Sequence, residues 1–237
     1  MTDKPHVSQS VQYAEQIIAE REIYSNSFFT SLKDGSMTLE EFRKTQVQFY
    51  SAVLFFARPM TALIARFPHP ATRLTILENV VEEHGDFSEK AFHESTFKEF
   101  LQSIDVDISN IAEIELWPEI RSFNSTLMTA CIFDEPEVGV ACLGVIEYMF
   151  AEISAIIGRT VVARNWCSEE KLVHYKLHST LDRRHAREFF DIIEDKWQDK
   201  TSSYMIKQGI EMGVYIFNRL YEDLYYSSHR GKRNIPA

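Results

Sequence analysis

The sequence contains few of the residues that break or cross-link a chain. It has only 8 Gly, 7 Pro and 3 Cys in 237 residues. The thiols Cys131, Cys142 and Cys167 are odd in number and form no CxxC pair, which favours buried, reduced cysteines over disulfides or a thiol catalyst. With 45% hydrophobic and 13% aromatic residues, the chain can bury a large core, and no Gly-, Ser- or Pro-rich linker divides it. We therefore predict a single domain over residues 1–237, with a flexible tail at 228–237.

Basic residues are in the minority. The chain has 25 Lys and Arg against 35 Asp and Glu, a net charge of −10, which disfavours nucleic acid and anionic membranes as partners. The opening MTDKPHVSQS has no apolar core and no Arg-rich amphipathic pattern, so we predict a cytoplasmic protein. The apolar run at 138–157 is long enough to span a membrane, but Glu147 and Glu152 lie near its middle. A buried helix of a globular bundle explains it better.

Several signatures of common enzyme classes are missing. The sequence has no GxSxG, GxxxxGK[ST] or HExxH motif and no Gly-rich strand-to-helix turn, which leaves serine hydrolases, P-loop enzymes, zincins and Rossmann enzymes without support. No long run alternates with period two, whereas apolar residues recur at helical spacing almost throughout. We predict an all-α bundle of about seven to eight helices. The helices are expected at 8–32, 38–67 with a kink at Pro59, 70–84, 88–104, 109–133, 136–164, 168–197 and 201–228.

The most informative motif is His178-x3-Asp182-x2-His185. On a helix these three side chains lie within about 60° of one another and share a face. Two imidazoles and a carboxylate suit a divalent iron, manganese or zinc ion better than calcium or magnesium. The alternative is a solvated ladder of ion pairs on a helix surface.

Two carboxylates in the apolar run strengthen the metal hypothesis. Glu147 and Glu152 fall in a segment that is apolar on nearly all sides, and a buried carboxylate must be paired, protonated or bound to a metal. Five residues apart, they diverge by about 140° on a helix. We expect at most one to face the same centre as the histidines, and the other to pair with an arginine.

A third group of donors surrounds Gly85, in the sequence EEHGD at 82–86 followed by His93. On a straight helix Glu82 and His93 would lie about 16 Å apart, too far to share an ion. We therefore expect Gly85 to break or unwind the helix. The carboxylate that faces the centre is left open among Glu82, Glu83 and Asp86. His84 and His174 are further candidates, although a lone histidine on an apolar helix is more often a core residue.

Together these motifs resemble those of the haem-oxygenase-like superfamily that includes TenA and PqqC, and within it the CADD-like diiron oxidases. The resemblance runs from NSFF at 26–29 and TLEE at 38–41 through EEHG at 82–85 and GVAC at 139–142, and is strongest at 178–187. It implies a haem-oxygenase-like (TenA/PqqC-like) helical bundle, a homodimer and two Fe(II) ions, with manganese or a mixed Fe/Mn pair as alternatives. The ligands that it implies are Glu82, His93, Glu147, His178, Asp182 and His185.

The resemblance also implies an activity, namely a diiron oxidase or oxygenase that uses O2 to oxidise a small organic substrate. CADD-like enzymes that make para-aminobenzoate consume one of their own tyrosines, but Phe29 stands at the matching position here and Ile157 replaces a lysine used in that chemistry. We therefore do not expect this self-consuming reaction, unless Tyr24 substitutes. Two alternatives are a metal-free enzyme like TenA or PqqC and a non-catalytic binding or regulatory protein on the same fold. Metal content and oxygen uptake distinguish them.

Overall fold

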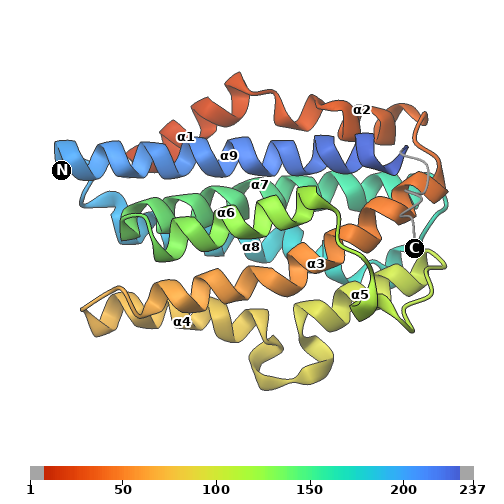
Figure 1. Cartoon of the computed structure of the whole chain (residues 1–237), viewed down its shortest axis with the longest axis horizontal. Helices are drawn as coiled ribbons and strands as arrows, with labels where there is room; N and C mark the ends of the chain where they lie inside the picture. Colours follow the sequence, from red (N-terminus) through yellow and green to blue (C-terminus); the bar gives the residue numbers. More distant parts are fainter. Residues whose placement is uncertain (1–7, 230–237) are drawn as a thin grey trace, which may run out of the picture.

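The computed structural model describes residues 8–229, and this part of the chain is helical with no strand (Figure 1). The expected fold class is therefore confirmed, with nine α-helices in the described range. They are α1 Gln9–Glu20, α2 Ser27–Asp34, α3 Leu39–Ile64, α4 Pro70–Glu83, α5 His93–Ser103, α6 Pro118–Ile132, α7 Pro136–Ala163, α8 Val173–Glu194 and α9 Lys200–Ser228. Short 3₁₀ turns lie at Ile23–Ser25, Gly85–Phe87, Glu89–Ala91, Ile111–Glu113 and Glu169–Lys171. Most of the predicted tail lies outside the described residues.

The prediction of one helix over 8–32 is wrong, because the chain turns between α1 and α2. Glu22 adopts a left-handed conformation, with φ of 47°, which ends the helical path. Asn26 then caps the second helix by accepting a hydrogen bond from the backbone N–H of Phe29 at 3.2 Å. This extra break explains why the described residues form nine α-helices instead of the seven to eight expected.

The predicted start of α3 is confirmed by its hydrogen bonds. The Glu41 N–H donates to Thr38 Oγ1 at 3.2 Å, and the Thr38 N–H donates to Glu41 Oε2 at 2.7 Å, so both halves of a capping box are present. Pro59 lies inside α3 without ending it. Helix α4 begins at Pro70 as predicted, whereas α5 at His93 and α6 at Pro118 begin later than predicted.

Helix α7 is the central element and packs against α6, α8 and α9 (Figure 1). Glycines allow close approach: a Cβ added at Gly209 of α9 would lie 2.4 Å from the Val138 carbonyl oxygen, and one at Gly144 of α7 would lie 2.9 Å from Phe189 Cβ of α8. By length and composition α3 and α7 could each cross a membrane, but 83% of the apolar window of α7 is buried in the bundle. The prediction of a buried core helix at 138–157 is confirmed.

The helical path breaks at Gly85, between α4 and α5, as expected. Gly85, Asp86 and Phe87 have φ of 56°, 51° and 67°. A Cβ at Gly85 would lie 2.4 Å from the backbone carbonyl carbon of Ala91, so only glycine fits there. The turn brings the end of α4 beside the start of α5.

Candidate metal centre

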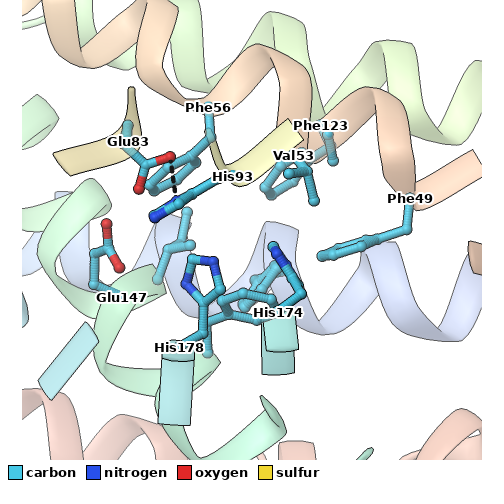
Figure 2. Close-up of a pocket in the computed structure, with 13 residues that line it drawn as sticks. Phe49, Val53, Phe56, Glu83, His93, Phe123, Glu147, His174 and His178 are labelled. Carbon is cyan, nitrogen blue, oxygen red and sulfur yellow. Dashed lines mark ion pairs between the residues drawn. The ribbon is translucent and has the colours of Figure 1, made fainter. Parts of the chain in front are cut away.

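Four helices bring acidic and imidazole side chains to one buried region of the bundle (Figure 2). The donors come from the end of α4, the first residue of α5, the middle of α7 and one face of α8, and each is at most 8% exposed. They are Glu83, His93, Glu147, His178, Asp182 and His185. The shared face of α8 follows from its 3.6-residue period, as predicted.

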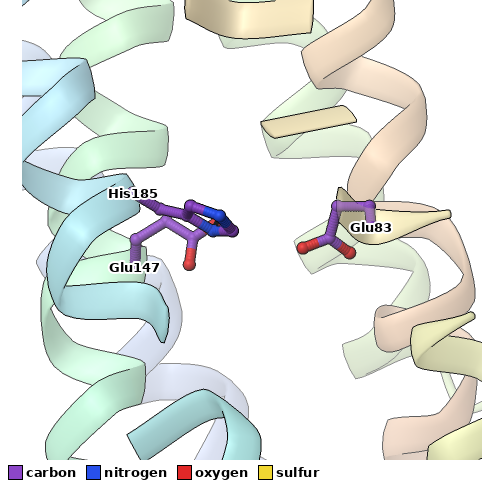
Figure 3. Close-up of side chains that lie close together, drawn as sticks. All are labelled: Glu83, Glu147 and His185. Atoms are coloured by element: carbon purple, nitrogen blue, oxygen red, sulfur yellow. Dashed lines mark ion pairs between the residues drawn. The ribbon is translucent and has the colours of Figure 1, made fainter. Parts of the chain in front are cut away.

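One half of this region is formed by Glu83, Glu147 and His185, which come from three different helices (Figure 3). One ligand-type atom from each lies within 4.8 Å of the others, close enough to hold a metal ion. His185 Nδ1 lies 3.7 Å from Glu147 Oε1, and neither atom has a hydrogen-bond partner although both are buried. Because unpaired buried polar atoms are costly, these orphaned donors fit a bound cation. One imidazole and two carboxylates suit divalent iron.

The other half contains His93, His178 and Asp182. The rings of His93 and His178 lie 4.4 Å apart between centroids, and His93 Nδ1 lies 2.9 Å from Glu83 Oε2 without hydrogen-bonding geometry. His178 Nδ1 pairs with Asp182 Oδ1 at 2.8 Å, while His178 Nε2 and Asp182 Oδ2 are buried without partners. The carboxylate thus orients the imidazole and leaves its other nitrogen free, as in many metal-binding histidines.

Charges in the centre depend strongly on one another. Burial raises the pKa of Glu147 to about 7, and the charge of Asp182 adds to this effect. Burial, followed by the charge of His93, lowers the pKa of His178 to about 3. Burial opposes protonation of His185, but the negative charge of Glu147, together with the hydrogen bond to Glu82 and the charge of Glu83, outweighs it and raises the pKa of His185 to about 10. A proton on His185 therefore balances carboxylate charge, whereas His178 stays neutral, and a divalent cation bound here would displace protons from the centre.

Glu82 and Glu83 point to different places. The structure places Glu83 among the converging donors, whereas Glu82, with its side chain 21% exposed, pairs with Arg184 and accepts from His185 Nε2 at 2.8 Å. Glu82 thus binds the Nε2 side of the His185 ring, which points away from the centre, and leaves Nδ1 facing the centre. Its role as a ligand stays a prediction, and the geometry favours Glu83, one of the open alternatives. The third alternative, Asp86, is exposed.

The two carboxylates of α7 also separate as expected. Glu147 is 3% exposed and faces the centre, whereas Glu152 pairs with Arg159 at 3.3 Å and with Arg183 at 3.4 Å. The prediction that the second glutamate pairs with an arginine is confirmed. His84, a further sequence candidate, is exposed and instead pairs through Nδ1 with its own helix.

His174, the other further candidate from the sequence, lies beside the converging donors. Its ring is fully buried, and its centroid lies 4.3 Å from that of His178. Burial, followed by the charges of His178 and His93, holds its pKa well below the usual range. Its position one turn before His178, on the same face of α8, accounts for this proximity.

A small cavity adjoins the converging donors (Figure 2). The cavity has a volume of about 40 Å³. Aromatic and aliphatic groups form most of its wall, and acidic and imidazole groups form the rest. The lining residues are Phe49, Ala52, Val53, Phe56, Glu83, His93, Phe123, Ile146, Glu147, Phe150, His174, His178 and Phe217. A largely apolar chamber beside a polar centre is typical of sites for small organic molecules.

Comparison with known proteins agrees with this arrangement. Residues 43–215 match the model of the family described as iron-containing redox enzymes, and the chain belongs to this family. It is 22% identical over 204 residues to a 4-aminobenzoate synthase of Chlamydia trachomatis, which covers 85% of this chain and 87% of that protein.

The similar solved structures establish the TenA-like, haem-oxygenase-like fold. A CADD-like protein of unknown function from Nostoc punctiforme has a TM-score of 0.76 at 12% identity and covers 93% of this chain and 97% of its own. A TenA homologue from P. horikoshii has a TM-score of 0.71 at 14% identity and covers 93% of this chain and 99% of its own. The family that the sequence motifs resemble is confirmed.

Proposed function

We propose that this protein is a non-haem diiron oxidase or oxygenase that uses O2 to oxidise a small organic substrate. The observation that carries the proposal is the buried set of three carboxylates and three imidazoles from four helices, several of whose donor atoms have no partner within the protein. Helical bundles that bind two irons use inward-facing carboxylates and histidines of this kind. Membership of a family of iron-containing redox enzymes supports the same function.

The donors divide into two groups that suit two ions. Glu83, Glu147 and His185 would hold one ion, and His93, His178 and Asp182 would hold the other. Two Fe(II) ions would supply the electrons that reduce O2. Manganese, or a mixed pair, fits the same nitrogen and oxygen donors.

The remaining residues orient the ligands and exclude water. Glu82 fixes the ring of His185 from behind, and Arg184 pairs with Glu82 in turn. Phe49, Phe150 and Phe217 cover the apolar side of the cavity. Such walls keep bulk water from a reactive centre and strengthen the electrostatic interactions inside it.

The substrate is proposed to be a separate small molecule rather than a residue of the chain. Curated relatives are named 4-aminobenzoate synthases. Phe29 and Ile157 are both buried here, and neither carries a hydroxyl or amine that such chemistry could use. Tyr24 lies in a surface hollow with Glu152 and not with Glu147. We therefore do not propose that this chain makes 4-aminobenzoate from its own tyrosine.

Metal analysis combined with oxygen uptake tests the proposal. Protein loaded with Fe(II) under anaerobic conditions and then desalted is expected to retain close to two irons per chain and to consume O2 when air is admitted. Glu147→Gln is expected to retain much less iron, whereas the matched variant Glu152→Gln, altered at a surface ion pair on the same helix, is expected to retain as much as the wild type. Wild-type protein that holds no iron, manganese or zinc would contradict the proposal and favour the metal-free or binding-protein alternatives.

A further inference from the structure

His174 is a buried polar residue for which the metal centre has no evident use. It is fully buried, lines the cavity and lies on α8 one turn before His178. Figure 2 shows Glu147 on one side of His178 and His174 on the other. The His174 and His93 ring centroids are 6.3 Å apart, against 4.4 Å for His93 and His178. His174 thus lies beside the converging donors, toward the aromatic part of the cavity.

Hydrogen bonds fix which nitrogen of His174 carries the hydrogen. Thr96 Oγ1 donates its only hydrogen to the His93 carbonyl oxygen at 3.0 Å. In this arrangement the Thr96 oxygen accepts from the Nδ1–H of His174 across the 3.0 Å contact between them. A second hydrogen on Nε2 would have no acceptor, because that atom is buried without a partner. Nε2 thus presents a lone pair.

The surroundings of this lone pair are aromatic. The ring of His174 makes edge contact with Phe97, with centroids 4.8 Å apart, and lies 6.3 Å from Phe150. Proteins generally avoid a buried acceptor that has no hydrogen-bond partner. An apolar side chain would fill this position without creating one. A histidine whose tautomer is fixed by a threonine from another helix is better explained by a ligand that donates to it.

We propose that His174 Nε2 accepts a hydrogen bond from the substrate, which is a small, largely apolar molecule carrying a hydroxyl or amine group. The inference rests on the proposed function, because it takes the cavity beside the metal centre as the substrate site. The aromatic wall binds the apolar body, and His174 sets the orientation of the donor group beside His178.

Matched probe molecules test this assignment. Phenol and toluene share a ring and differ by a hydroxyl against a methyl group, and aniline offers an amine donor. Equilibrium dialysis against protein loaded anaerobically with Fe(II) is expected to show phenol and aniline binding about tenfold more tightly than toluene. A wild-type protein that binds neither donor probe more tightly than toluene would overturn the proposal.

Variants at two positions assign the preference to His174. His174→Phe is expected to bring the phenol-to-toluene affinity ratio close to one, whereas His174→Gln, whose amide oxygen can still accept, is expected to restore part of it. Thr96→Val removes the group that fixes the tautomer and is expected to lower the ratio by less than His174→Phe. Phe150→Leu serves as the matched control, because it alters the apolar wall and should weaken phenol and toluene alike.

The iron content of each variant separates this role from metal binding. His174→Phe is expected to keep the wild-type iron content and helical circular dichroism. A loss of iron in that variant would show a seventh ligand, and an unchanged ratio would show an ordinary core residue; either result overturns the proposal. The dialysis is repeated without Fe(II) to separate the two proposals. If the protein retains no iron but still prefers phenol, the proposed function is contradicted and the role of His174 is supported.

Discussion

Glu82 and Glu83 show how adjacent residues with the same chemistry take different roles. Successive side chains on a helix diverge by about 100°, so only one of two neighbours can face a given centre. Glu83 faces Glu147 and His185, and Glu82 holds the far nitrogen of His185 together with Arg184. Glu83 thus resembles a ligand, and Glu82 a residue that positions one.

Substitution of each glutamate is expected to separate these roles. Glu83→Gln should leave little iron on the protein after desalting, because it replaces a charged oxygen donor within the centre. Glu82→Gln should retain most of the iron and weaken its affinity by about 10- to 100-fold, the usual effect of altering a residue that orients a ligand. Iron per chain and a titration against a competing chelator measure the two effects. The reverse order would identify Glu82 as the ligand.

The sequence predicts those donors that lie in one continuous helix. His178, Asp182 and His185 share a face through spacing alone, and the structure buries all three. The choice between Glu82 and Glu83 depends instead on where α4 ends. The role of Thr96 beside His174 depends on contact between α5 and α8, far apart in sequence, which periodicity cannot reveal.

At the scale of elements, the start of α1 is held by a carboxylate from the end of α8. Glu194 accepts hydrogen bonds from the hydroxyls of Ser8 and Ser10, both at 2.6 Å, and from the backbone N–H of Gln9 at 2.7 Å. Burial opposes ionisation of Glu194, but hydrogen bonds led by those of Ser10 and Ser8 outweigh it and hold its pKa below the ordinary value of 4.5. A negative charge at a helix N-terminus also favours the helix dipole.

Glu194→Gln is therefore expected to destabilise the protein by about 1 kcal/mol at pH 7, after allowance for solvent screening at this partly exposed site. Because the pKa is lowered in the folded state, the contribution is complete above pH 4.5 and is lost as pH falls through the folded-state pKa. The difference in the free energy of unfolding between variant and wild type should thus be smaller at pH 3 than at pH 7. Denaturant unfolding at both pH values measures it, with Glu20→Gln, an exposed residue of α1, as control. A stability difference between variant and wild type that increased at pH 3 would contradict this role.

Helix boundaries were predictable where the sequence carries its own end signals. The predicted spans 136–164 and 201–228 agree closely with α7, Pro136–Ala163, and α9, Lys200–Ser228. The break near Glu22 has no glycine or proline to mark it. Glu22 itself is exposed and adopts a positive φ, while the next residue, Ile23, is buried in the core. Such a break depends on tertiary structure and is invisible to periodicity.

At the scale of the whole molecule, the buried carboxyl groups should make stability depend on metal. Asp182 is fully buried with one unpartnered oxygen, and burial raises its pKa well above the usual range. Asp182→Asn is therefore expected to leave the melting temperature of the metal-free protein level or raised, because it removes a group that is costly to ionise there. A metal ion bound only by the folded state adds about 2.7 kcal/mol at 100 times its Kd.

Anaerobic calorimetry with and without Fe(II) measures this dependence. The wild type is expected to melt at a higher temperature with Fe(II), and Asp182→Asn is expected to lose most of that shift. Glu152→Gln should keep the full shift, because that residue lies in a surface ion pair. An identical Fe(II)-dependent shift in wild type and Asp182→Asn would show that Asp182 does not hold the metal.

The turn at Gly85 gives the two sides of the centre different freedom. Glu147 and the donors of α8 belong to helices whose close packing at Gly144 resists sliding. Glu83 and His93 instead stand at the two ends of one short connection, 84–92. Two ions, one bound in part by Glu83 and the other in part by His93, would hold both ends of this loop in place, and closing a loop so short costs little chain entropy. Iron could thus enter and leave by opening one small loop while the rest of the bundle stays folded.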